Sequence, residues 1–327
     1  MTERTARSVY VFLAIGLVAA SQSGNLIRIG DAHPTAIAAW RLLLASLMML
    51  PFGWRSLGRI AQLPLVDLGL LALAGVALAG HLIAWIAAVQ HTTVANASVF
   101  FAINPVLTAV AAYLVFGERM SRHLLLAVLL GIAGVTVIGA HDLDVSPRSF
   151  LGDALSLLCS VLFTLYFLAG KRPRAHIDSG AYVTVVYGVA GLASLAAVLA
   201  LGEPVLSYSP RNWTCFVLMA LVPTMIGHTA FNHALRYLDA SRISAATLSE
   251  PAMAGLVAWW AWGEALTGAT LAGYLLISVS VLALVFDFRQ RTEESRARVH
   301  GAMQSKNPSA SSQPHVDSGS NQSQSMA

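Results

Sequence analysis

Two long apolar segments of the chain carry a polar residue directly before a proline. Glu250 precedes Pro251, and Asn104 precedes Pro105. Apolar surroundings disfavour a charged carboxylate, so Glu250 suits either proton exchange or the binding of an amine. Each proline removes a backbone hydrogen bond and kinks its helix, which frees a carbonyl for a polar ligand or a water molecule. These four residues are candidates for a binding or gating site, although Glu250 could also be a neutral acid hydrogen-bonded to a neighbouring helix.

Arg41 also lies inside an apolar segment, in contrast to the other Lys and Arg residues of the chain. Its guanidinium could hold a carboxylate through two hydrogen bonds, pair with Glu250, or extend along its stem to a polar boundary. His81 and Trp85 are four residues apart and share one face of a predicted helix. We take all three as further candidates for ligand contacts, with helix packing as the alternative for the histidine.

The same four-residue spacing joins His228 to Asn232 in a later apolar segment. Gln22 and Asn25 belong to a polar stripe in the first apolar segment, and such a stripe must face other helices or a water-filled path. None of these residues has the His, Cys, Asp or Glu spacing that is typical of a metal site. We therefore expect no metal and no cofactor.

The composition predicts that the helices carrying these residues cross a membrane. Charged residues make up 11% of the chain and apolar residues 56%, whereas a soluble domain carries about 25% charged residues. Apolar runs of about 20 residues match the roughly 30 Å thickness of the hydrocarbon core. Ten such spans are expected: Val9–Ile27, Thr35–Leu50, Val66–Val89, Val94–Phe116, His123–Ala140, Leu151–Gly170, Ala181–Leu201, Trp213–Leu235, Ser244–Trp262 and Thr267–Phe286.

The distribution of positive charge predicts the orientation. An even number of spans places both termini on one side of the membrane. If that side is the cytoplasm, sixteen of the 20 Lys and Arg residues are cytoplasmic and three are external, as the positive-inside rule requires. The high isoelectric point thus reports membrane orientation, and we expect no nucleic-acid partner.

The chain contains an internal repeat with an offset of 146 residues. Asn104 to Tyr113, followed by Gly117-Glu118, resembles Glu250 to Trp259, followed by Gly263-Glu264. The glycines are expected to end these helices, and Ser121 and Thr267 to N-cap the next ones. Because each repeat holds five spans, an odd number, the second half must enter the membrane in the opposite orientation, as in many secondary transporters.

With these motifs in place, residues 8 to 288 resemble the EamA-type branch of the drug/metabolite transporter superfamily. The residues that carry the resemblance are the two Pro-containing spans that end in Gly-Glu, Arg41, Ala87-Ala88, His233-Ala234 and Gly152-Asp153. The resemblance implies ten helices, cytoplasmic termini and export of metabolites, amino acids or drugs by alternating access. The family's Trp-Gly pair is absent from the first span, where Gln22 to Gly24 stand.

The predicted fold is therefore an all-α integral membrane protein of ten transmembrane helices, arranged as two inverted five-helix repeats with cytoplasmic termini. Residues 8–140 form the first repeat and residues 150–288 the second, and the polar segment 289–327 is expected to be a disordered cytoplasmic tail. The expected location is a bacterial inner membrane.

The predicted function is secondary-active transport, in the direction of export, of small metabolites such as amino acids. The alternatives are a nucleotide-sugar or phosphorylated-sugar exchanger and, in another class, a membrane-embedded enzyme or a scaffold that transports nothing. No motif for catalysis or ATP binding occurs at membrane depth, so we do not expect an enzyme. The expected partners are a small-molecule substrate and the lipid bilayer; proton coupling and a homodimer are left open.

Overall fold

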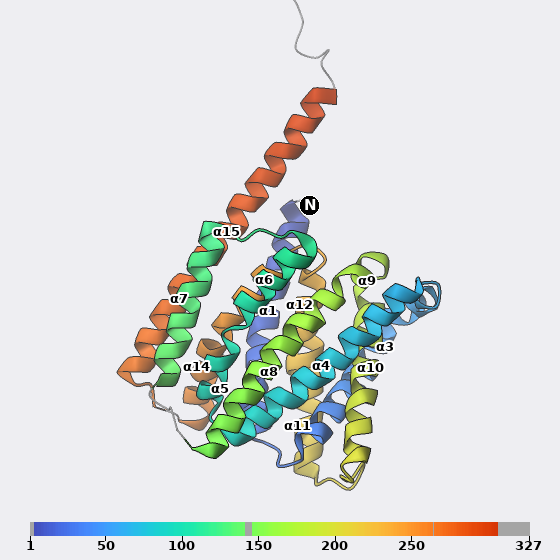
Figure 1. Cartoon of the computed structure of the whole chain (residues 1–327), viewed down its shortest axis with the longest axis vertical. Helices are drawn as coiled ribbons and strands as arrows, with labels where there is room; N and C mark the ends of the chain where they lie inside the picture. Colours follow the sequence, from blue (N-terminus) through green and yellow to red (C-terminus); the bar gives the residue numbers. More distant parts are fainter. Residues whose placement is uncertain (1–2, 141–145, 264, 307–327) are drawn as a thin grey trace, which may run out of the picture. The chain divides into compact units, whose positions relative to one another are not determined.

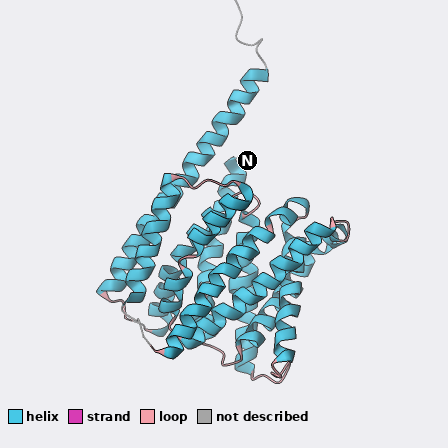
Figure 2. Cartoon of the chain, in the orientation of Figure 1, coloured by secondary structure: helices cyan, strands magenta, loops and turns pink. Residues whose placement is uncertain are grey.

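The structure, a computed structural model, describes residues 3–140, 146–263 and 265–306. In this part of the chain the secondary structure consists of helices joined by loops, without a strand (Figures 1 and 2). The helices of the first half are α1 (Glu3–Ser21), α2 (Ser23–Ile27), α3 (Pro34–Ile60), α4 (Leu65–His91), α5 (Val94–Phe101), α6 (Asn104–Phe116) and α7 (Arg122–Gly139). Those of the second half are α8 (Pro147–Ala169), α9 (Lys171–His176), α10 (Ser179–Ala200), α11 (Pro210–Met219), the π-helix η2 (Ala220–His228), α12 (Thr229–Ala234), α13 (Ala240–Ala246), the 3₁₀-helix η3 (Thr247–Ser249), α14 (Glu250–Trp262) and α15 (Gly268–Lys306).

Nine segments of the described residues are long and apolar enough to cross a membrane, and each overlaps one of the ten predicted spans. Together they define an all-helical, multi-pass membrane protein. The other predicted span, Ser244–Trp262, falls on α13, η3 and α14, three short helices in succession. The 3₁₀ turn η3 separates α13 from α14, whose second residue is Pro251, because proline cannot donate the backbone hydrogen bond that a continuous helix needs.

The Pro-containing helices of the two halves have equivalent bounds. α6 and α14 begin 146 residues apart, at Asn104 and Glu250, and also end 146 residues apart. Each is followed by a glycine with positive φ, 71° at Gly117 and 67° at Gly263, a conformation that glycine adopts without the steric penalty of a Cβ. Both sequence motifs thus end their helices as predicted.

Side chains at the helix starts explain why the next elements begin where they do. Ser121 accepts a hydrogen bond from the backbone N–H of Leu124 at 3.0 Å, before α7. Thr267 accepts one from Thr270 at 3.1 Å, before α15. Both predicted N-caps are therefore confirmed, and α7 and α15 also start 146 residues apart.

α15 is longer than the last predicted span. It continues to Lys306, so residues 289–306 are helical where the sequence predicts a disordered tail. This stretch is rich in Arg, Glu, Gln and Ala, which have high helix propensity. The chain forms two compact units, Met1–Leu284 and Val285–Ala327, and the packing described below lies within the first. Residues 307–327 of the predicted tail and Glu264 lie outside the described residues.

The eighth predicted span contains a widened turn that positions His228. η2 includes Pro223, whose ring cannot be accommodated in regular α-helical hydrogen bonding. The Thr224 hydroxyl donates to the carbonyl of Met219, five residues earlier, at 2.8 Å. The segment is therefore locally unwound between α11 and α12, in the place where it packs against α1 and α3.

Candidate functional site

A cavity of about 70 Å³ lies among helices of both halves. α1, α2, α3, α4, α5 and α7 line it from the first half, and α8, η2, α12, η3 and α14 from the second. Its charged and polar lining residues are Ser21, Ser23, Arg41, His81, Ser98, His228, Thr247 and Glu250. The cavity is therefore a place where residues distant in sequence from both halves can bind one small molecule.

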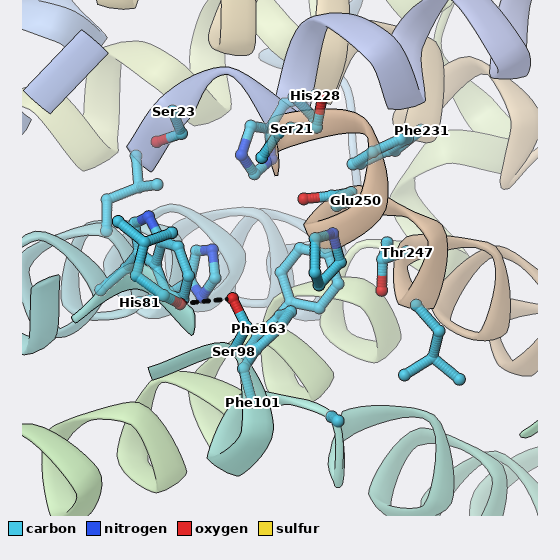
Figure 3. A pocket seen from close by; sticks show the side chains of 18 of the residues that line it. Ser21, Ser23, His81, Ser98, Phe101, Phe163, His228, Phe231, Thr247 and Glu250 are labelled. Atoms are coloured by element: carbon cyan, nitrogen blue, oxygen red, sulfur yellow. Dashed lines mark hydrogen bonds between the residues drawn. The ribbon is translucent and has the colours of Figure 1, made fainter. Parts of the chain in front are cut away.

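Glu250 is the acidic residue of this cavity. It is the first residue of α14, and its side chain extends from the ribbon toward the space between Ser98, Phe163 and His228 (Figure 3). Within the described part of the chain, no ion pair or hydrogen bond engages its carboxylate oxygens. A carboxylate that faces a cavity without a protein partner is suited to take a cationic or hydrogen-bond-donating group from a ligand.

Arg41, by contrast, is fully buried and held by hydroxyl groups. Its Nε donates to Thr224 Oγ1 at 2.5 Å, and its Nη1 donates to Ser23 Oγ at 3.2 Å. No ion pair joins it to Glu250 in the described residues. Arg41 therefore fixes η2 and α2 against α3 and supplies positive charge to the cavity wall, while two of its three nitrogens are already engaged.

The two histidines of the cavity lie edge to face, with ring centroids 6.0 Å apart. His81 Nδ1 lies 3.1 Å from the carbonyl oxygen of Cys159, so Nδ1 carries the hydrogen and Nε2 is the acceptor of the neutral ring. His228 Nδ1 is buried and has no hydrogen-bond partner in the described residues. An orphan buried nitrogen calls for a ligand group or a water molecule.

Aromatic rings complete the wall of the cavity. Phe163 lies 4.8 Å from His81 and 5.7 Å from Phe101, measured between ring centroids. Trp85 lies 5.8 Å from Phe101, and Phe231 lies 5.8 Å from His228. Aromatic faces beside a carboxylate favour cations and other apolar groups that carry one polar end.

A second, larger cavity of about 390 Å³ adjoins the first and shares Val94, Ser98, Pro251 and Ala254 with it. It lies at the ends of the helices, where Arg28 follows α2, Thr93 precedes α5 and residues 265–267 precede α15. Its volume falls in the range of small-molecule sites. The two cavities together lead from one end of the helices into the interior.

The opposite end of the same helices is closed by polar contacts. Asn104, which is fully buried, donates to the carbonyl of Ser160 at 2.9 Å and to Thr164 Oγ1 at 3.1 Å, and it accepts a hydrogen bond from Ser244. Lys171 pairs with Glu118, and Arg172 Nε lies 2.7 Å from an oxygen of the buried Asp67. These contacts tie α4, α6, α8, α9 and α13 together on this side.

The structure brings some of the predicted residues together and separates others. Glu250, Arg41, His81, Trp85, His228 and Pro251 line the smaller cavity, and Asn25 lines the larger one. Four predicted residues line neither cavity: Gln22, Asn104, Pro105 and Asn232. Asn232 instead hydrogen-bonds to Tyr166, Arg174 and the carbonyl of His228, and Gln22 to Ser21 and Val18.

The carbonyls freed by the prolines are also engaged by the protein. The carbonyl of Phe101, four residues before Pro105, accepts the Ser160 hydroxyl at 3.2 Å. The carbonyl of Thr247 accepts the backbone N–H of Glu250. The prolines therefore shape the two helix breaks, and each carbonyl that they free accepts one hydrogen bond within the protein.

Sequence reasoning missed several lining residues, namely Ser23, Ser98, Phe163 and Phe231. Aromatic and serine residues are common in membrane helices, so type alone does not mark them. One usable signal was the repeat, which places Ser98 in the position equivalent to Ser244.

With the fold and the cavities described, the comparison with known proteins defines the class. The EamA-like transporter family model matches the chain twice, over residues 7–140 and 150–286. The chain therefore belongs to the EamA-like transporter family, and it is a membrane transporter. A solved crystal structure superposes with a TM-score of 0.71 at 19% identity, covering 87% of this chain and 98% of the other, which shows that the fold is shared.

Curated relatives carry transporter names. An uncharacterized transporter of Archaeoglobus fulgidus is 28% identical over 244 residues, which are 74% of this chain and 83% of the relative. The protein RarD of Salmonella typhi is 25% identical, over 75% of this chain and 81% of the relative. A probable amino-acid metabolite efflux pump of Salmonella typhimurium is 26% identical over 57% of this chain and 64% of its own length.

Proposed function

We propose that the protein is a secondary-active exporter of small amine-bearing metabolites, such as amino acids or related compounds, in a bacterial inner membrane. The observation that carries this proposal is the Glu250 carboxylate, which has no hydrogen-bond or ion-pair partner among the described residues and faces an aromatic-walled cavity between the two halves. An ammonium group would satisfy the carboxylate, and an apolar or aromatic substituent would pack on the rings. The name of the Salmonella efflux pump is in keeping with such a substrate.

The proposed mechanism is alternating access by two inverted five-helix repeats, with ten spans and both termini in the cytoplasm. In this arrangement the larger cavity opens to the outside and the contacts of Asn104 and Lys171 close the cytoplasmic side. The proposal is supported by the equal bounds of α6 and α14 at the offset of 146 residues, by the two family matches, and by the excess of Lys and Arg on the proposed cytoplasmic side.

The phosphorylated-sugar alternative has less support. Binding a phosphate would require free cationic donors in the cavity. Arg41 is the one Lys or Arg residue that lines the smaller cavity in the described chain, and two of its nitrogens already donate to hydroxyls. The acidic Glu250 would repel a phosphate in the same space.

The test is efflux from proteoliposomes loaded with a mixed pool of amino acids, amines and phosphorylated sugars. Mass spectrometry follows each compound with and without an imposed pH gradient, and protein-free liposomes give the leak rate. We expect selective loss of amine-bearing compounds, accelerated by the gradient if Glu250 also carries protons. Loss of phosphorylated sugars alone, or loss of every compound at the leak rate, would reject the proposal.

A further inference from the structure

Four polar residues near the two helix breaks form two equivalent pairs. With the offset of 146 residues, Ser98 corresponds to Ser244 and Asn104 corresponds to Glu250. We propose that Ser98 and Ser244 are reciprocal gate residues: Ser244 on Asn104 holds the cytoplasmic side closed in this conformation, and Ser98 on Glu250 closes the outer side in the opposite one. This inference rests on the proposed function, because it needs two halves that exchange conformations.

The cytoplasmic pair is formed in the structure. The Ser244 hydroxyl donates to Asn104 Oδ1, and both side chains are fully buried. Ser244 belongs to α13 and Asn104 to α6, and these two helices pack against each other. The hydrogen bond therefore joins the two halves at the start of α6, in the middle of the span Val94–Phe116.

The equivalent outer pair is open. Ser98, on α5, and Glu250, on α14, both line the smaller cavity (Figure 3), and no hydrogen bond joins them. The Ser98 hydroxyl donates to the carbonyl of Val94 in its own helix at 2.7 Å. α5 and α14, which are the counterparts of α13 and α6, face each other across the cavities that Val94, Ser98, Pro251 and Ala254 line in common.

The chemistry of the two pairs is the same. A serine hydroxyl can donate to the carboxylate of Glu250 as it does to the amide oxygen of Asn104. Because α6 and α14 have equal length and equal glycine ends, the second half can adopt the arrangement that the first half has now. Glu250 can then bind either a ligand or Ser98, so ligand release frees the carboxylate to close the outer side.

Two equivalent cysteine reporters test this exchange. Ala95 lines the larger cavity, and its counterpart Ser241 is buried at the cytoplasmic end. Each is replaced by cysteine, one at a time, in a background in which the buried Cys159 and Cys215 are replaced by alanine. The rate of reaction with a hydrophilic maleimide is measured in purified protein without substrate.

The expected changes are opposite for the two serines. Ser244→Ala should slow labelling at position 95 and speed it at position 241, and Ser98→Ala should do the reverse. The loss of the neutral Ser244 hydrogen bond corresponds to roughly a twofold to tenfold shift in the population of the two states, and the loss of a Ser98 hydrogen bond to a carboxylate corresponds to roughly a 10- to 150-fold shift. Ser98→Thr and Ser244→Thr keep the hydroxyl and should restore the parent rates.

The matched control is Ser194→Ala. Ser194 is buried in α10 and donates to the carbonyl of Ala190, four residues earlier, at 2.9 Å, as Ser98 does within α5. It should leave both reporters within twofold of the parent. The inference is overturned if the two gate variants move a reporter in the same direction or leave both reporters unchanged.

A further variant covers the case in which an alanine variant fails to fold. Glu250→Leu removes the acceptor of the outer pair, so it should disfavour the closed outer side, speed labelling at position 95 and slow it at position 241. Slower labelling at position 95 would overturn the inference. Because labelling needs no substrate, reciprocal gating without selective efflux would reject the proposed function alone, and selective efflux without reciprocal labelling would reject the gate alone.

Discussion

Replacing Glu250 by glutamine tests the central residue of the proposed site with almost no change of shape. The carboxylate contacts the cavity and has no hydrogen bond or ion pair to lose in the described part of the chain. We therefore expect the free energy of unfolding to change by less than about 0.5 kcal/mol. Transport should respond much more strongly, because glutamine cannot form an ion pair with an ammonium group.

The size of the transport defect follows from the lost interaction. A hydrogen bond to a charged partner contributes about 1.5–3 kcal/mol, and about 1.4 kcal/mol corresponds to a factor of ten. The kcat/KM for efflux of an amine should thus fall roughly 10- to 150-fold. If Glu250 carries protons, the acceleration of efflux by a pH gradient should be lost as well.

The assay is initial efflux of the preferred amine from proteoliposomes, with thermal unfolding in detergent measured on the same preparations. Glu203→Gln, in the loop between α10 and α11, makes the same chemical change outside both cavities and should transport within twofold of the parent. If Glu250→Gln transported at the parent rate at every pH, Glu250 would be a structural residue, and the reasoning about the cavity would be wrong.

Four further substitutions test the packing and the helix ends. Arg41→Lys should lower stability by about 2 kcal/mol, because an ammonium cannot replace both guanidinium bonds to hydroxyls; an unchanged unfolding midpoint would contradict the role given to Arg41. Gly117→Ala and Gly263→Ala should each lower the free energy of unfolding by about 1 kcal/mol. The two losses should be equal, because nothing lies within 4 Å of either added Cβ and only the positive φ is unfavourable. Unequal shifts in thermal unfolding would contradict the equivalence of the two helix ends. Asp178→Ala removes the N-cap of α10 and should cost about 1 kcal/mol at neutral pH. Partial burial raises the pKa of Asp178, but hydrogen bonds from Ser56 and from backbone N–H groups outweigh this effect and hold the pKa below 3.8. The cap therefore stabilises the fold above that pH, and its contribution is lost as the pH falls through the lowered pKa. The difference in stability between parent and variant should vanish in unfolding measured near pH 2 and persist at pH 7.

Most of the helices could be predicted from the sequence because the membrane imposes a strong and simple requirement. A segment must be apolar and about 20 residues long, and the part of the chain that the structure describes has nine such segments where the composition places them. The helix ends at Gly117 and Gly263 and the caps at Ser121 and Thr267 follow from local chemistry. The interruption at Thr247–Ser249 was foreseen only as a kink at Pro251.

The site was less accessible to sequence reasoning. Glu250, Arg41, His81, Trp85 and His228 could be selected because polar and ionisable groups are expensive in a membrane and must face the interior. The same argument selected Asn104 and Asn232 equally well, yet their side chains hydrogen-bond to other residues of the protein and line neither cavity. The free-energy cost of exposing a polar side chain to lipid predicts which residues face the interior of the protein. It does not predict which of them form hydrogen bonds with other residues there.

The sequence by itself determined that the chain is a helical membrane protein with two similar halves. Hydropathy, charge distribution and the repeat offset of 146 residues can all be read along the linear chain, without knowledge of tertiary contacts. Only the tertiary structure decided which member of each equivalent pair is engaged. Asn104 meets Ser244 and is buried, whereas Glu250 and Ser98 face a cavity. The difference lies in contacts between segments that are distant in sequence, and local sequence does not encode such contacts.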